Sequence, residues 1–142
     1  MSKHNALIRH IDGVTFVGKT EDSNHWVVMD GPEDFGGSNA SVRPKELLLL
    51  ALGGCSASDV AVILKKKRAI VDDFQIKVSA ESTEEHPKVY SKIHVEYLIK
   101  GKNLKEKDVE RAIDLSENNY CGVRAMLKNS VEITSSYEIT ES

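Results

Sequence analysis

Cysteine is scarce in this 142-residue chain, which contains only Cys55 and Cys121. Two cysteines are too few for the disulfide framework of a small secreted domain. A domain of this length buries roughly 68–70% of the surface of its unfolded chain, so it can fold without disulfides or a structural metal. We therefore expect one domain, residues 1–142, whose two thiols are either packing groups or a reactive pair.

Several other functional signals are missing. No apolar run follows residues 1–5, so we predict no secretory signal and expect a cytoplasmic protein, in which a disulfide is transient. A net charge of −3 without a large basic cluster argues against a nucleic-acid partner. The five histidines show no H-x-x-x-H spacing and neither cysteine has a C-x-x-C partner, so no metal site is predicted. The chain has no G-x-G-x-x-G or P-loop motif, and we predict no cofactor.

The one long hydrophobic run, residues 47–64, has a length that is borderline for a membrane span. Asp59 lies within it and the basic residues 65–68 follow it directly. A charge at bilayer depth is costly. We therefore predict no membrane association and interpret the run as a helix that is buried within protein on nearly all sides.

Periodicity and turn residues predict the order βββ-α-ββ-αα-β. Alternating apolar residues are typical of half-buried strands, and the Asp12-Gly13 pair between the first two strands predicts a hairpin. This pattern favours an α+β fold, in which an antiparallel sheet packs on a long buried central helix. The expected elements are strands 5–11, 14–19 and 24–30, a loop over 31–42, a helix over 43–68, strands 73–81 and 89–100, helices 104–118 and 121–128, and a strand over 131–139.

The central helix also predicts a partner. Its apolar residues lie around the whole circumference, and one small sheet cannot cover all of them. We therefore expect a homodimer in which two copies of helix 43–68 are enclosed between two sheets.

The two thiols suggest peroxide chemistry. A thiolate that attacks a peroxide becomes a sulfenic acid, which condenses with a second thiol to form a disulfide. Cys55 follows a glycine pair that allows close approach, but Asp59, one helical turn on, would raise its pKa. Cys121 begins a helical turn and shares a face with Arg124. Buried packing is an equally good interpretation of either cysteine, and a surface position is the simplest one for Arg124.

Three segments resemble the family of osmotically inducible protein C and organic hydroperoxide resistance proteins (OsmC/Ohr), and together they make the resemblance specific over essentially the whole chain. They are Arg43-Pro44 with Glu46-Leu47-Leu48, Ala51-Leu52-Gly53-Gly54-Cys55 and Asp59-Val60; Glu84-Glu85-His86-Pro87-Lys88; and Tyr120-Cys121 with Val123 and Ala125-Met126-Leu127.

The resemblance implies an intertwined homodimer that reduces organic, and in some members inorganic, hydroperoxides in the response to oxidative or osmotic stress. It implies that Cys55 is the peroxidatic cysteine and Cys121 the resolving one, both at the subunit interface. The implied reductant is a small dithiol of the dihydrolipoyl type. The alternative is a non-catalytic stress protein that binds a small apolar ligand at the dimer interface.

The chain also departs from the best-characterised branches, which resemble it less than the divergent OsmC-like branch does. Those branches place a glutamate directly after the proline that precedes the cysteine helix, where this chain has Lys45 and then Glu46. They also use an arginine from the early strands, where this chain has no arginine between Arg9 and Arg43. Glu46 and Arg124 are therefore the candidates for the charged partners, although Glu46 lies nine positions before Cys55, on the opposite face of a straight helix.

Overall fold

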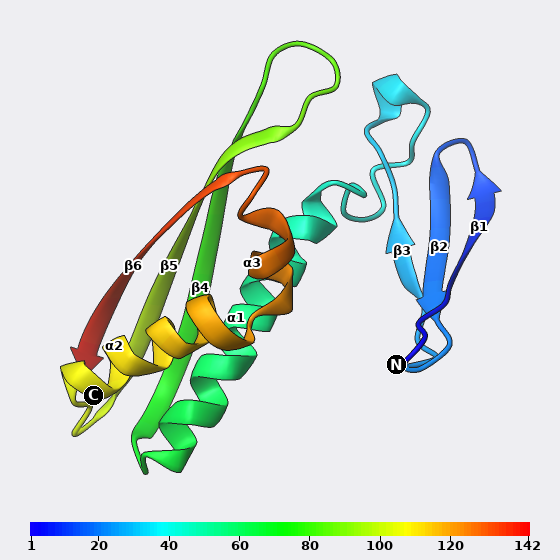
Figure 1. The fold of residues 1–142 in the computed structure, drawn as a ribbon. Coiled ribbons are helices and arrows are strands. Elements are labelled where there is room, and N and C mark those ends of the chain that lie inside the picture. The colour runs from blue at the N-terminus through cyan, green and yellow to red at the C-terminus, as the bar shows by residue number, and fades with distance from the viewer. The chain divides into compact units, whose positions relative to one another are not determined.

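The computed structural model describes residues 1–142, which form two compact units, residues 1–48 and 49–142. The first unit is a three-stranded antiparallel sheet in the order β1-β2-β3 (Figure 1, blue to cyan). Its strands are β1 (Ala6–Asp12), β2 (Thr15–Thr20) and β3 (Val27–Met29). Asp12 pairs with Thr15 across the turn, which confirms the predicted Asp-Gly hairpin.

The loop that follows β3 is organised by one buried carboxylate, Asp30. It accepts hydrogen bonds from the Thr15 hydroxyl (3.0 Å) and from the backbone N–H groups of Gly31 (2.8 Å), Ser38 (3.2 Å) and Ala40 (3.1 Å). These bonds wrap the predicted loop 31–42, which contains the short 3₁₀ helix η1 (Glu33–Phe35), around a single side chain. The loop is therefore held by specific polar contacts.

The ionisation of Asp30 depends on the same contacts. Burial by itself raises the pKa of this carboxyl, but the hydrogen bonds from Gly31, Ala40, Ser38 and Thr15 outweigh burial and lower the pKa below 3.8. The hydrogen bonds that hold the loop therefore favour the ionised form of Asp30.

The loop should loosen in acid. Because the folded-state pKa of Asp30 is lower than the value of about 3.9 in an unfolded chain, its stabilising contribution is complete above about pH 4 and is lost as the pH falls through the folded-state pKa. Amide exchange measured by NMR should show falling protection of Ser38 and Ala40 in that range. Asp30→Asn should lower their protection already at neutral pH, whereas the exposed Asp34→Asn should not. Equal protection in Asp30→Asn and the wild-type chain would contradict this account.

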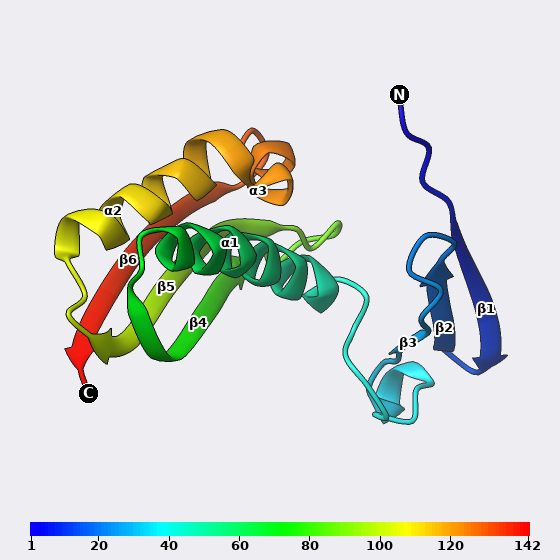
Figure 2. The ribbon, with the colours of Figure 1, turned by 90° about the horizontal axis from the view of Figure 1, so that it is seen from below.

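The second unit carries the remaining helices and strands. Its sheet has the order β4-β5-β6, and α1, α2 and α3 lie on one face of it (Figures 1 and 2). The elements are α1 (Glu46–Lys66), β4 (Ile70–Ser82), β5 (Tyr90–Lys102), α2 (Glu106–Leu115), the π-helical turn η2 (Ser116–Tyr120), α3 (Gly122–Leu127) and β6 (Glu132–Glu141). The α+β class and the predicted element order are confirmed.

The direction of the last strand corrects the sequence prediction. β4 and β5 form the expected long antiparallel hairpin, but β6 runs parallel to β5, in register from Lys92 beside Glu132 to Gly101 beside Glu141. Residues 106–127 carry the chain back along the sheet, so β6 starts beside the start of β5. Parallel neighbours require such a crossover. Alternating side chains indicate a strand but not its direction, so the sequence alone did not show that the sheet is mixed.

The core of this unit lies between the sheet and the helices. Gly53 of α1 approaches β4 so closely that a Cβ at this position would lie 3.0 Å from Cγ2 of Val78. The first glycine of the pair in α1 is thus explained by helix–sheet packing, whereas a Cβ on Gly54 would meet nothing within 4 Å. The buried hydrophobic residues are Leu52, Val60, Leu64, Ile93, Val95, Tyr97, Ile99, Val109, Ala112, Ile113 and Cys121.

The other face of α1 is open in the single chain. The exposed fractions are 44% for Leu48, 59% for Leu50 and 54% for Val62. The sheet covers only the inner face of the helix, which agrees with the expectation that one small sheet cannot cover its whole circumference. By length and mean hydropathy (2.1) α1 is also able to span a membrane, but the core helix of a soluble protein passes the same test.

Candidate active site

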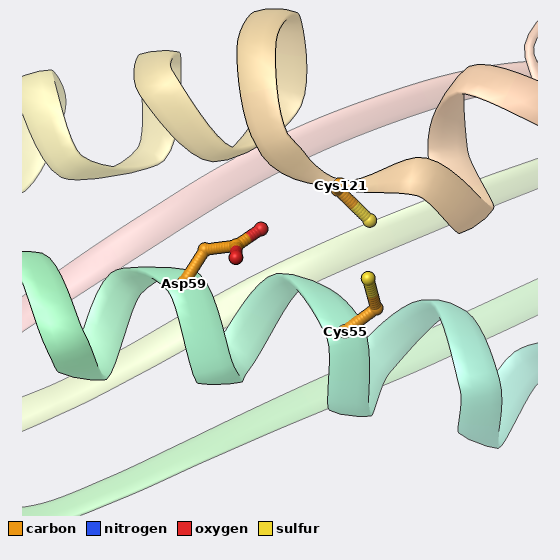
Figure 3. A group of neighbouring side chains, drawn as sticks. All are labelled: Cys55, Asp59 and Cys121. Carbon is orange, nitrogen blue, oxygen red and sulfur yellow. The ribbon is translucent and has the colours of Figure 1, made fainter. Parts of the chain in front are cut away.

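The two cysteines, 66 residues apart in sequence, lie next to each other in the second unit. Cys55 projects from α1, and Cys121 is the N-cap residue of α3 (Figure 3). Their sulfur atoms and a carboxylate oxygen of Asp59 all lie within 4.8 Å of one another, and both thiols are free. The structure therefore brings together the two thiols that the sequence marked as candidates.

The turn η2 places Cys121 at this position. The backbone N–H of Cys121 donates to the carbonyl oxygen of Ser116 (2.8 Å), a bond that spans five residues and widens the helix by one residue. The sequence predicts an ordinary helix over 104–118, whereas α2 ends at Leu115 and continues as the π turn. Such turns are rare and frequent at functional sites. Helical periodicity could not reveal this one, because its geometry depends on the contacts made by Ser116.

Buried serines connect η2 to α1. The Ser116 hydroxyl donates to Oδ2 of Asp59 (2.9 Å) and also lies 3.4 Å from the carbonyl oxygen of Ser56. The Ser56 hydroxyl lies 3.5 Å from the sulfur of Cys121. Both serines are fully buried. Together these contacts fix Asp59 on α1 and Cys121 after η2 at the place where these two elements meet.

Cys55 lies in surroundings that disfavour its thiolate. Burial raises the pKa of the Cys55 thiol, and the neighbouring Cys121 and the Asp59 carboxylate raise it further. A hydrogen bond from the backbone N–H of Val123 opposes this shift without reversing it. The sulfur of Cys121 accepts a hydrogen bond from the backbone N–H of Arg124 (3.4 Å), as an N-cap side chain does.

Arg124 is more buried than the sequence suggested, with an exposed side-chain fraction of 12%. Its Nη1 lies 3.2 Å from Oε1 of Glu117, and its Nη2 donates to the carbonyl oxygen of Ile133 (3.3 Å). The Tyr97 hydroxyl donates to the same Glu117 oxygen (3.3 Å). Burial and the Glu117 carboxylate raise the pKa of the Tyr97 phenol well above its usual value. The chain thus contains a shielded Glu–Arg pair next to the segment that carries Cys121.

Sequence reasoning missed Glu117, Tyr97 and Ser116 as members of the site. Nothing in the local sequence marks Glu117 or Ser116. Both residues lie in the π turn, and their partners come from distant elements.

Glu46 has a local structural contact. Its Oε1 accepts a hydrogen bond from the backbone N–H of Arg43 (2.8 Å), the reciprocal contact of a capping box at the start of α1. Nine residues separate it from Cys55, or about 13 Å along a helix that rises 1.5 Å per residue. The structure therefore does not bring Glu46 into the group formed by the cysteines and Asp59.

A groove of about 680 Å³ borders this group of residues. Asp59 lines one part of it, and the groove runs between α1 and the residues at the end of α2 and in η2. The other lining residues are Val62, Ile63, Lys66, Lys67, Leu115 and Tyr120. A second hollow of about 410 Å³ lies over strands β4, β5 and β6 and includes neither thiol.

Comparison with known proteins identifies the family. Residues 36–136 match the family model of OsmC, described as OsmC-like protein, and the match includes both cysteines. The chain belongs to the OsmC-like protein family. It is 40% identical over 134 residues to protein YhfA of Escherichia coli K12, which covers 94% of this chain and 96% of YhfA.

Solved structures show the OsmC fold across a wide range of sequences. A hypothetical protein from Aquifex aeolicus VF5 superimposes with a TM-score of 0.85 at 34% identity and covers 100% of this chain and 99% of its own. An organic hydroperoxide resistance protein OsmC from Legionella pneumophila superimposes with a TM-score of 0.69 at 14% identity, covering 97% and 98%. The second likeness is one of fold alone. The resemblance and the fold inferred from the sequence are thus confirmed.

Removing the charge of Asp59 should make Cys55 more reactive. Asp59→Asn deletes one of the groups that raise the pKa of the Cys55 thiol, so its thiolate should form at lower pH. The rate of iodoacetamide alkylation at Cys55, followed by peptide mass spectrometry against pH, should shift to lower pH. Asp73→Asn, which changes an exposed carboxylate on β4, is the matched control. An alkylation profile that does not move in Asp59→Asn would contradict this electrostatic account.

Proposed function

We propose that this OsmC-like chain is a thiol-dependent peroxidase that reduces organic hydroperoxides through a dithiol–disulfide cycle of Cys55 and Cys121. The observation that carries the proposal is the approach of two free thiols, from distant parts of the chain, to within 4.8 Å inside a shielded polar group. Support also comes from relatives of the same fold, such as the Legionella protein, whose names include organic hydroperoxide resistance.

The proposed chemistry balances in three steps. The Cys55 thiolate attacks the distal peroxide oxygen, the O–O bond breaks, and the products are Cys55 sulfenic acid and an alkoxide that takes up a proton. The Cys121 thiol then attacks the sulfenic sulfur, forming the disulfide and releasing water. A small dithiol, in our proposal one of the dihydrolipoyl type, reduces this disulfide by thiol–disulfide exchange and leaves as its own disulfide.

Accessibility supports the assignment of the two roles. Cys55 is half-buried, whereas the exposed fraction of Cys121 is 3%. A peroxide that enters from solvent therefore meets Cys55 first, and Cys121 lies close behind it to resolve the sulfenic acid. The apolar sides of the bordering groove, including Val62, Ile63 and Leu115, suit the alkyl part of an organic hydroperoxide.

Exchange of each cysteine tests the cycle. Cys55→Ser should abolish turnover of cumene hydroperoxide, because the nucleophile is lost. Cys121→Ser should react once and leave a sulfenic acid at Cys55 that dimedone traps. Intact-mass and peptide mass spectrometry after one equivalent of peroxide should find the Cys55–Cys121 disulfide only in the wild-type chain. Ser79→Ala, at an exposed position of β4 outside the proposed interface, is the control and should form the disulfide as the wild-type chain does.

Two results would contradict the proposal. If both Cys55 and Cys121 of the wild-type chain remain free thiols after peroxide treatment, the cycle is ruled out. If Cys121 becomes oxidised in Cys55→Ser while Cys55 stays reduced in Cys121→Ser, the two roles are reversed.

The alternative function is non-catalytic binding of a small apolar ligand. The groove beside Asp59 favours it, as does the raised pKa of Cys55, which lowers the fraction of reactive thiolate. A small molecule that co-purifies with a chain lacking peroxide turnover would support this function over the enzyme.

We further propose that the working form is a homodimer with the site at the subunit interface. The outer face of α1 leaves Leu50 and Val62 exposed, and full burial of each such side chain contributes roughly 1.5–3 kcal/mol. Gly54 on this face has open space around its Cα, so a second helix can approach closely. A second copy of the chain supplies an apolar surface of the same kind.

Sedimentation should show a species of twice the 15.7 kDa chain mass at micromolar concentration. Val62→Lys places a charge on the outer face of α1 and should shift this species toward the monomer. Gln75→Lys, at an exposed position of β4, adds the same charge outside the proposed interface and should not. A wild-type monomer with full peroxidase activity would refute the dimer and the interfacial location of the site.

A further inference from the structure

We propose that the reduced chain binds one thiophilic divalent cation, Zn²⁺, through the sulfur atoms of Cys55 and Cys121 and the carboxylate of Asp59. The proposal concerns the resting dithiol and does not require that the chain turns over peroxide. It rests on the arrangement of these three side chains, which point toward one another from α1 and from the start of α3 (Figure 3).

The distances are close to those of a coordination site. The three ligand atoms lie within 4.8 Å of one another. In a tetrahedral zinc site, with bonds of about 2.0–2.3 Å, neighbouring ligand atoms are separated by about 3.5–3.8 Å. The ligand atoms therefore need to approach one another by about 1.3 Å at most to reach this spacing.

The placement of the ligands explains why the sequence predicted no metal site. Cys55 and Asp59 are four residues apart and share one face of α1, an arrangement that suits two ligands of one metal. The third ligand, Cys121, comes from a part of the chain that the π turn η2 brings against this face. The familiar C-x-x-C and H-x-x-x-H spacings describe ligands that are close in sequence, so they do not detect this set.

Two of the three ligands, Asp59 and Cys121, also have outer contacts that hold them in place. The Ser116 hydroxyl donates to Asp59 (2.9 Å), and the backbone N–H of Arg124 donates to Cys121 (3.4 Å). The Ser56 hydroxyl lies 3.5 Å from the same sulfur. Hydrogen bonds of this kind orient metal ligands and affect the affinity for the metal strongly.

Electrostatics favour a cation at this point. Two thiols and a carboxylate within a few ångströms repel one another when they are ionised. A divalent cation between them turns this repulsion into attraction, because both thiols give up their protons and bind the cation as thiolates. Two sulfur ligands select a soft or borderline metal over Mg²⁺ or Ca²⁺, and Zn²⁺ does not oxidise thiols.

The fourth position of a tetrahedral ion is left for water. Cys55 is half-buried, and Asp59 lines the open groove along α1, so solvent reaches one side of the site. Bound zinc would occupy both sulfur atoms. Zinc binding and disulfide formation are therefore mutually exclusive, and zinc should protect the thiols from peroxide and from alkylation.

Titration of the reduced chain with Co²⁺, without peroxide or a dithiol present, tests the site directly. We expect saturation at one Co²⁺ per chain, with the intense visible absorption of tetrahedral cobalt and sulfur-to-cobalt charge-transfer bands. Zn²⁺ should displace the cobalt and bleach these bands. Absence of saturable binding in a chain with two free thiols would overturn the proposal.

Variants distinguish the proposed ligands from non-specific thiol binding. Cys55→Ser and Cys121→Ser should each lose the charge-transfer bands of the wild-type site. Ser116→Ala keeps all three ligands but removes the hydrogen bond to Asp59, and it should weaken Zn²⁺ binding by about 10–100-fold. Asp59→Asn should weaken it at least as much while both thiols remain. Asp73→Asn is the matched control and should bind as the wild-type chain does.

Zinc affinity that is unchanged in Asp59→Asn would show that the thiols bind alone and would overturn the site. Circular dichroism of each variant confirms that it is folded before it is titrated. Zinc binding with no peroxide turnover would leave this site intact and refute only the peroxidase. Peroxide turnover with no zinc binding would refute only the zinc site.

Discussion

The contact between the π turn η2 and α1 is the interaction on which the site depends. Ser116 begins the turn and donates to Asp59 on the helix, and its carbonyl oxygen holds the backbone of Cys121. Ser116 and its neighbour Ser56 on α1 are both fully buried, so their hydrogen bonds face little competition from water. The π turn adds one residue to the helix before Cys121, and it thereby sets the direction from which Cys121 approaches Cys55.

The site combines two demands that oppose each other. Peroxide attack needs a thiolate at Cys55, yet burial and the neighbouring Asp59 and Cys121 hold that thiol in its protonated form. A bound cation, or a second subunit that changes the surroundings of the outer face of α1, would alter this balance. The proposed zinc site and the proposed peroxidase thus compete for the same reduced thiols, and the disulfide formed in the peroxidase cycle excludes zinc.

The Glu117–Arg124 pair bears on how this chain departs from the best-characterised OsmC relatives. The sequence offered Glu46 as the acidic partner, but in the structure Glu46 caps α1. The shielded acid is Glu117, which contacts Arg124 and Tyr97 from within the π turn. A charged pair therefore exists beside the cysteine segment, although it comes from elements other than the helix start and the early strands.

Local patterns in the sequence determined most of the elements, because alternation, helical runs and the Asp12-Gly13 turn depend on near neighbours. The family could also be identified from the sequence, since both cysteine segments occur in the order that the family shows. Tertiary structure decided the parallel direction of β6, the π turn and the grouping of Cys55, Asp59 and Cys121. The physical reason is that each of these features depends on contacts between residues far apart in the chain, about which hydrophobic periodicity carries no information.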